Sequence, residues 1–290
     1  MDPFSTDSEL VNIHTAFTQA QYNLVLSDYE ATSFSESNRP AVQVLQYRAQ
    51  LALGQNSKVL STISATKASS SPDLAVVRLL ALYLNGSEDD AASQAESLAE
   101  QHGKNVNVQI LAGTVLARAG KQEQALQLLA KHEGSLDAVA LIVQIHLSQN
   151  RVDLARKEAQ SARAFAQDAL GVNLCEAWVG MRTGGDAYQA AFYVFEELAQ
   201  GPSTVSAASL IAQAVAELHL HRFEEAESAL DQALALEPEN ETALTDKYVL
   251  DTITGKEATV PKGTELLEDL DAKREAFQQA MSKYSPKFEA

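Results

Sequence analysis

One stretch, residues 213–240, constrains the fold more than any other part of the chain. It reads QAVAELHLHRFEEAESALDQALALEPEN, and Phe223, Ala226 and Leu230 recur in it at spacings of three and four. Residues at these spacings share one face of an α-helix, and Pro238 ends that helix because proline cannot continue the backbone hydrogen bonding. The stretch therefore predicts two antiparallel helices that pack across a tight turn.

The second half of this stretch has the pattern F-x-x-A-x-x-x-L-x-x-A-x-x-x-x-P, which is typical of the second helix of a tetratricopeptide repeat. In that repeat a small residue lets the two helices approach closely. An equivalent packing residue recurs along the chain with successive differences of 34, 36, 30, 30, 36 and 35, near the 34-residue period of the repeat. The positions are Val25, Val59, Ala95, Ala125, Ala155, Ala191 and Ala226. The sequence therefore predicts an all-α fold, an α-solenoid of about seven tetratricopeptide-like hairpins.

We expect one solenoid domain, residues 1–290. Its hairpins are predicted near residues 8–30, 42–63, 74–100, 108–131, 138–164, 173–199 and 207–237, followed by helices at 241–254 and 264–283. Ser71, followed by Pro72 and Asp73, predicts a capped helix start.

Thr264 is expected to cap the last helix, which should be a C-terminal capping helix, because a terminal repeat must hide its open apolar face. The residues expected to cover that face are Leu266, Leu267, Leu270, Phe277 and Met281.

The charge of the chain argues against two classes of partner. Lys and Arg number 22 against 39 Asp and Glu, so the net charge of −17 repels phosphate backbones and anionic lipid headgroups. We therefore expect neither nucleic-acid binding nor direct membrane binding. Two interpretations of the acidic surface stay open: the acidic residues only keep the chain soluble, or they help to select a basic partner.

The ends and the single cysteine bear on location. The start MDPFSTDSEL has no basic segment followed by an apolar run, and the apolar run 74–84 is far shorter than the roughly 20 residues that a bilayer span needs. Cys175 cannot form an internal disulfide, which fits a reducing compartment, and it is expected to be a small core residue. These features predict a cytoplasmic protein.

No motif in the chain predicts catalysis. His219 and His221 are two residues apart and point to different faces of a helix, so they do not form a metal site by themselves. Gly184 and Gly185 lack the strand and the Lys-Ser/Thr of a phosphate loop and are expected to form a turn. The sequence therefore predicts a binding and scaffolding protein that is not an enzyme and that has no cofactor and no metal.

In solenoids of this kind the first helix of each hairpin lines the inner groove. Counting from each packing residue, the concave positions are Leu10, His14, Val44, Arg48, Leu80, Leu84, Ile110, Thr114, Ala140, Gln144, Glu176, Gly180, Ile211 and Val215. An exposed apolar groove would favour aggregation, so a partner is expected to occupy it. The alternative is a shifted register, in which these residues belong to the core.

Several further motifs resemble the epsilon subunit family of coatomer. They are Ser71-Pro72-Asp73-Leu74 before Val77-Arg78-Leu79-Leu80-Ala81, Val143-Gln144-Ile145, Asp153-Leu154-Ala155-Arg156-Lys157-Glu158, Ala177-Trp178-Val179, Thr183-Gly184-Gly185 before Phe192-Tyr193-Val194-Phe195-Glu196-Glu197, and Phe277 with Tyr284-Ser285-Pro286. The resemblance rests on the order and spacing of these motifs, which are spread over most of the chain, from about residue 11 to residue 286.

This resemblance implies a non-catalytic structural subunit of the COPI vesicle coat, acting in Golgi-to-ER retrograde and intra-Golgi transport. It implies that the C-terminal region of alpha-COP is the direct partner, that beta-prime-COP belongs to the same subcomplex, and that other coatomer subunits are present. Association with Golgi and COPI vesicle membranes would be peripheral, on the cytosolic side and indirect through the coat.

The alternative function is a generic tetratricopeptide adaptor or co-chaperone that binds a peptide in its groove. A chaperone clamp uses Lys and Asn where this chain has Leu10 and His14, so the sequence disfavours that alternative.

Overall fold

The computed structural model describes residues 8–201, 204–261 and 264–284, and every regular element within these ranges is a helix. The predicted all-α fold is therefore confirmed. The chain divides into two compact units, unit 1 (Met1–Val205) and unit 2 (Ser206–Ala290). The expectation of one continuous domain stays a prediction.

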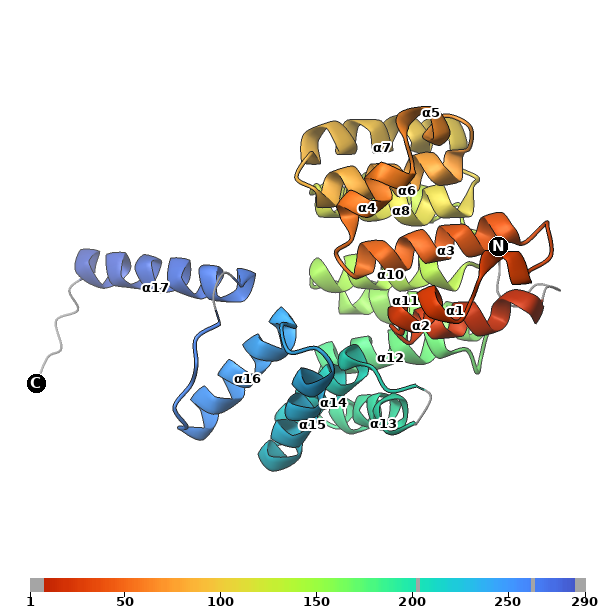
Figure 1. Ribbon diagram of the computed structural model, residues 1–290. Coiled ribbons are helices and arrows are strands. Elements are labelled where there is room, and N and C mark those ends of the chain that lie inside the picture. Colours follow the sequence, from red (N-terminus) through yellow and green to blue (C-terminus); the bar gives the residue numbers. More distant parts are fainter. Residues whose placement is uncertain (1–7, 202–203, 262–263, 285–290) are drawn as a thin grey trace, which may run out of the picture. The chain divides into compact units, whose positions relative to one another are not determined.

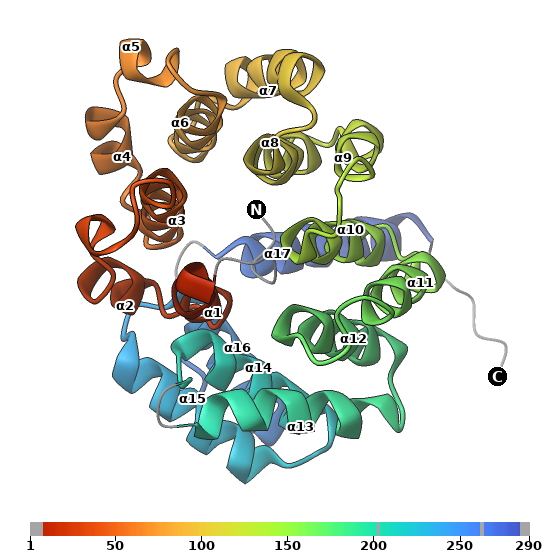
Figure 2. The same ribbon diagram turned by 90° about the vertical axis from the view of Figure 1, so that its right-hand side faces the viewer.

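Unit 1 has an inner row and an outer row of helices (Figures 1 and 2). The inner helices are α1 (Val11–Thr18), α3 (Arg39–Ala52), α6 (Pro72–Leu84), α8 (Val106–Arg118), α10 (Leu136–Ser148) and α12 (Leu170–Thr183). Each contacts the next along the row, and α12 also contacts α1, so that the inner row curls back on itself as Figure 2 shows.

The outer helices are the second members of the hairpins. They are α2 (Tyr22–Ser27), α4 (Asn56–Thr62), α7 (Glu88–His102), α9 (Gln122–Leu129), α11 (Val152–Arg163) and α13 (Ala187–Gln200). The short helix α5 (Ala65–Ala68) and the 3-10 turns η1 (Ser8–Leu10) and η2 (Ala31–Ser33) complete the described elements of unit 1. The Ser71 cap is confirmed, because its hydroxyl accepts a hydrogen bond from the backbone N–H of Asp73 at 3.2 Å.

Unit 2 consists of α14 (Ala207–His219), α15 (Phe223–Leu236), α16 (Glu241–Thr254) and α17 (Glu265–Lys283). The pair α14–α15 is the hairpin from which the repeat was first identified. It begins with a capping box in which Ser206 and Ser209 exchange side-chain-to-backbone hydrogen bonds. Leu230 of α15 and Leu250 of α16 are buried.

The predicted packing residues are buried within the hairpins. All seven predicted packing residues lie on the second helix of a hairpin, and none is more than 2 % exposed: Val25, Val59, Ala95, Ala125, Ala155, Ala191 and Ala226. A side chain larger than these at such a position would hold the paired helices apart. The periodic small residue therefore explains why the hairpins pack closely.

The positions of the hairpin turns show that the packing residue of the third repeat was predicted one helical turn too late. The turn residues of six hairpins have positive φ: Ala20, Gly54, Gly86, Gly120, Asn150 and His221. In the other five the packing residue follows five positions later, and five positions after Gly86 is Ala91, one helical turn before the predicted Ala95. Both alanines are completely buried, so the correction keeps the same helix face.

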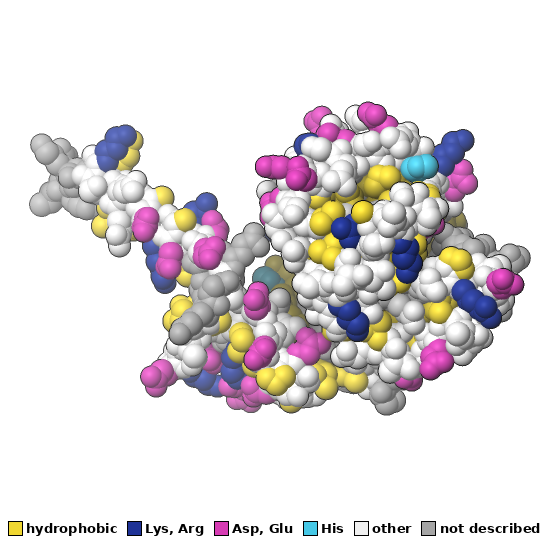
Figure 3. Space-filling model, turned by 45° about the horizontal axis from the view of Figure 1, so that its top comes forward, with side chains coloured by type: hydrophobic (Ala, Val, Ile, Leu, Met, Phe, Trp, Pro, Cys, Tyr) yellow, Lys and Arg dark blue, Asp and Glu magenta, His cyan; other side chains and the backbone are white. Residues whose placement is uncertain are grey.

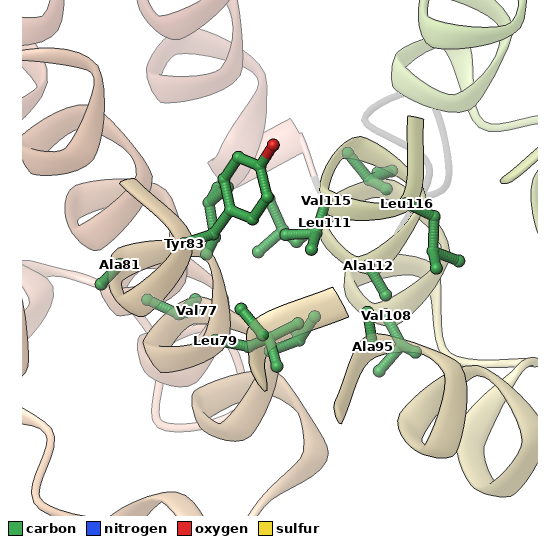
Figure 4. Packing of buried hydrophobic residues seen from close by; sticks show 14 of the residues in the cluster. Val77, Leu79, Ala81, Tyr83, Ala95, Val108, Leu111, Ala112, Val115 and Leu116 are labelled. Carbon is green, nitrogen blue, oxygen red and sulfur yellow. The ribbon is translucent and has the colours of Figure 1, made fainter. Parts of the chain in front are cut away.

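The largest hydrophobic cluster lies in the middle of unit 1. Figure 4 shows part of it, with Leu79 and Tyr83 of α6 directed toward Leu111 and Val115 of α8. The inner helices thus contribute side chains to the core as well as to the inner face. This is why a sequence position on an inner helix can be buried from two sides.

The last helix forms as predicted but differs from the expected cap in its side chains. Phe277 and Met281 are 65 % and 59 % exposed, so they do not cover an apolar face; acidic, basic and hydrophobic side chains are all exposed along α17 (Figure 3). Thr264 lies at the N-cap position, but its hydroxyl accepts no capping hydrogen bond. Leu270 is half-buried, and the side chains of Leu266 and Leu267 lie outside the described residues.

Candidate partner-binding face

The predicted concave residues of unit 1 lie on or beside inner helices, and the structure brings five of them together. Leu10, His14, Val44, Arg48 and Ile110 line one cavity of about 50 Å³, which Ser135, Leu136 and Asp137 also line. The cavity is therefore formed by residues from the start of α1, from α3, from α8 and from the start of α10. We call this set of residues the inner cavity.

The expectation of an exposed apolar groove is wrong for these residues. Leu10, Val44 and Ile110 are 3 %, 4 % and 7 % exposed, and Leu80 of α6 is 9 % exposed. The reason is the curl of the inner row, which brings the inner helices against one another. In the free chain these side chains therefore belong to the core, as the alternative interpretation of the sequence proposed.

Outside the inner cavity, several predicted positions on the inner helices of unit 1 are half-buried or exposed. Leu84 at the end of α6 and Thr114 on α8 are half-buried, and Gln144 on α10 is exposed. Ala140 is half-buried and packs against the hydrophobic cluster shared by α10, α11 and α12. In unit 2, Ile211 of α14 is buried and Val215 is half-buried.

Two positions were assigned to the wrong face. Glu176 and Gly180 of α12 line a separate hollow of about 390 Å³ between α11 and α13. Glu176 forms a 2.7 Å ion pair with Arg163 of α11, and an added side-chain carbon at Gly180 would approach α13 at Ala187. The longer turn at Gly184 and Gly185 shifts the register of this hairpin, which explains the error.

An ion pair on the inner face was not predicted from the sequence. Arg48 Nη2 donates a hydrogen bond to Asp137 Oδ2 at 2.8 Å, and the guanidinium also stacks over the Phe17 ring at 4.6 Å from its centroid. Arg48 was among the concave positions. Its partner lies 89 residues away in the first turn of α10, and nothing in the spacing of the sequence indicates that contact.

Electrostatics hold Asp137 in its ionised form. Burial acts to raise the pKa of this carboxyl group, but the positive charge of Arg48, the electrostatic interaction with His14 and the hydrogen bond from Arg48 outweigh it, so the pKa lies below its ordinary value. Asp137 also lies in the first turn of α10, where the helix dipole favours a negative charge. The ion pair is therefore present throughout the neutral pH range.

The remaining titratable candidates do not form a reactive site. Burial raises the pKa of the Cys175 thiol to about 12, in agreement with its predicted position in the core. Among the described residues, no group of three His, Cys, Asp or Glu side chains is placed to hold a metal ion. None of the helices described has the length and apolar character of a membrane-spanning segment.

The family model and the relatives found by sequence comparison indicate the same protein family. The sequence model of the coatomer epsilon subunit family matches residues 6–289. A probable coatomer subunit epsilon of Schizosaccharomyces pombe is 31 % identical over 256 residues, which cover 88 % of this chain and 84 % of the relative. Coatomer subunit epsilon-1 of Arabidopsis thaliana is 29 % identical over 86 % of this chain and 85 % of its own length.

Comparison with solved structures supports the repeat fold. The crystal structure of the APC/C hetero-tetramer Cut9-Hcn1 contains a similar chain, with a TM-score of 0.62, 17 % identity and coverage of 86 % of this chain. The match spans about half of that longer chain. At this identity the similarity shows the fold alone, which is a tetratricopeptide solenoid.

Proposed function

Because the chain belongs to the coatomer epsilon subunit family, we propose that it binds and stabilises the C-terminal region of alpha-COP within the COPI vesicle coat. Membership of the family makes the chain a structural coat component that does not act as an enzyme. We further propose that beta-prime-COP belongs to the same subcomplex, and that the assembly serves Golgi-to-ER retrograde and intra-Golgi transport from the cytosolic side of the membrane.

The observation that carries this proposal is the family match over residues 6–289. The surface chemistry agrees with it. A chain of net charge −17 is repelled by anionic lipid, so its membrane association would be indirect, through the other coat subunits. Leu10, which stands where a chaperone clamp needs a lysine, is buried, and this disfavours the co-chaperone alternative.

We propose that the inner face of unit 1 receives the alpha-COP segment. Tetratricopeptide solenoids bind partners on the surface formed by the first helices of their hairpins. On that surface the accessible positions include Leu84, Thr114 and Gln144, and the inner cavity contributes buried apolar residues. A partner that covers these positions would exclude water from the face and stabilise both chains.

The test of partner choice is co-expression with the C-terminal region of the cognate alpha-COP. The mass of the purified species is then measured by light scattering coupled to size exclusion. A stable one-to-one complex is the expected result, and two separate peaks would contradict the proposal.

The test of the face uses substitutions that spare the core. Replacing Leu80 by Asp would bury a carboxylate in the hydrophobic cluster and unfold the chain, so it is unsuitable. Changing Thr114 and Gln144 together to Lys places two charges on the inner face and should weaken alpha-COP binding at least tenfold, about 1.4 kcal/mol. Its matched control is Gln101→Lys with Gln127→Lys, which adds the same charge at exposed positions of the outer helices α7 and α9. Equal affinities of the two double variants would place the partner elsewhere.

A further inference from the structure

The inner cavity is too small to hold a peptide segment in this conformation. Its volume is about 50 Å³. On the same measure a cavity needs about 10–15 Å³ to hold one water molecule, so it has room for a few waters at most. A peptide strand or helix therefore cannot enter between α1, α3, α8 and α10 in this conformation. If a partner segment binds there, the inner face must have a second, wider arrangement.

The Arg48–Asp137 ion pair crosses this space. It joins α3 to α10, which are not successive inner helices, and the two side chains are 11 % and 27 % exposed. Because Arg48 also stacks on Phe17, one guanidinium group connects α1, α3 and α10. The contact of α12 with α1 closes the same curl at the ends of the row.

Such a pair has the energetics of a reversible closure. Removing one member leaves a charge without its counter-ion in a partly dehydrated site, which is strongly unfavourable. Separating both members into water, or giving each a new polar partner, costs far less because their mutual attraction is offset by the dehydration of both charges. The pair can therefore hold the closed form without making the open form inaccessible.

We propose that the Arg48–Asp137 pair is a latch that keeps unit 1 closed in the free chain, and that it separates when a partner segment occupies the inner face. The second half of this inference rests on the proposed function. The first half concerns the free chain alone. The two halves are tested by separate measurements.

The free-chain measurement is the distance between two spin labels in the full chain. The labels replace Gln43 of α3 and Lys157 of α11, both exposed, in a Cys175→Ala background so that these are the only cysteines. Because α11 is paired with α10 in one hairpin, the label distance reports separation of α3 from α10. The parent chain should give one narrow distance distribution.

Asp137→Asn removes the charge with little change of shape. It should add a longer-distance population at least fivefold larger than any in the parent. The matched control is Asp153→Asn, which removes an equally short ion pair, Arg151–Asp153 at 2.8 Å, that lies at one helix end and joins no separate helices. The control should leave the distribution unchanged.

Arg48→Lys serves if Asp137→Asn does not fold, as judged by circular dichroism. Lysine keeps a counter-ion for Asp137 but loses the planar stacking on Phe17, so it should give a smaller long-distance population. In whichever variant folds, a distribution that superimposes on the parent would overturn the latch. The same long-distance population in Asp153→Asn would also overturn it.

The second half is measured by adding the alpha-COP C-terminal region to the labelled parent chain. A longer distance in the complex is expected. An unchanged distance in a complex whose formation is verified by light scattering would refute opening on binding. Absence of any complex would contradict the proposed function and opening on binding together, while the partner-free distances would still decide the latch.

Discussion

Asp246 of α16 shows how one residue makes stability depend on pH. Its side chain is half-buried, and this burial raises the pKa of its carboxyl group to about 6. A folded-state pKa above the unfolded value means that folding favours the protonated form. The stabilisation is fully present below the unfolded pKa of about 3.9, and it is lost as the pH rises through 6.

We therefore predict that Asp246→Asn changes the pH dependence of folding. Between pH 5 and pH 7 the wild-type free energy of unfolding should fall by about 1 kcal/mol relative to that of the variant, with the magnitude reduced by the water that Asp246 still contacts. Urea unfolding of both chains, followed by circular dichroism at several pH values, measures this difference. Parallel pH profiles would show that Asp246 titrates normally in the folded chain.

Most other shifted carboxyl groups act in the opposite direction. Hydrogen bonds from Ser35 and Asn38 lower the pKa of Glu9, and hydrogen bonds from Lys256 and Lys247 lower that of Glu227. A lowered folded-state pKa gives stability that is present above the unfolded value and lost as the pH falls through the folded one. Their effect therefore belongs to acid conditions, below the window in which Asp246 titrates.

At the scale of elements, the α8–α9 hairpin depends on a missing side chain. Gly113 lies inside α8, where glycine is about 1 kcal/mol less favourable than alanine. A side-chain carbon added at this position would lie 3.2 Å from Cγ of Leu129, which is completely buried on α9. The close approach of the two helices therefore requires glycine despite its low helix propensity.

We predict that Gly113→Ala destabilises the chain by about 1 kcal/mol, because overpacking in the core exceeds the gain in helix propensity. The matched control is Gly171→Ala in α12, where the added carbon would meet Leu136 at an ordinary 3.4 Å. The control should be neutral or slightly stabilising. Urea denaturation measures both, and a stabilised Gly113→Ala chain would show that Leu129 moves without cost.

At the scale of the whole molecule, unit 1 contains hydrophobic clusters of its own. Three clusters of buried residues, one around α1 to α3, one from α3 to α10 and one from α10 to α12, lie entirely within unit 1. Each cluster overlaps the next through a shared helix. Buried hydrophobic side chains thus form a continuous core from α1 to α12 within unit 1.

We predict that residues 1–205 fold when expressed alone. The fragment should show the helical circular dichroism expected for its helices and a cooperative thermal transition, because three hydrophobic clusters lie within it. Asp137→Asn should lower the melting temperature of the fragment and of the full chain by similar amounts. A fragment without a cooperative transition would mean that unit 2 is needed for the stability of unit 1.

The sequence by itself determined the helices, the hairpins and the residues that pack within each hairpin. This was possible because helix periodicity, capping at Ser71 and the small packing residue at positions such as Ala125 act over a few residues to about one repeat. The longer turn at Gly184 explains one error of register. The other arose because Ala91 and Ala95 lie one helical turn apart on the same buried face, so spacing alone does not distinguish them.

Only the tertiary structure decided how the inner face is closed. The curl of the row is the sum of small rotations between successive hairpins, and no single residue encodes that sum. It brings Arg48 to Asp137 across 89 residues and buries Leu10, Val44 and Ile110, which the spacing alone placed in an open groove. The exposure of Phe277 could likewise not be predicted from the apolar stripe of α17. An amphipathic pattern shows which face of a helix is apolar, but it does not show what covers that face.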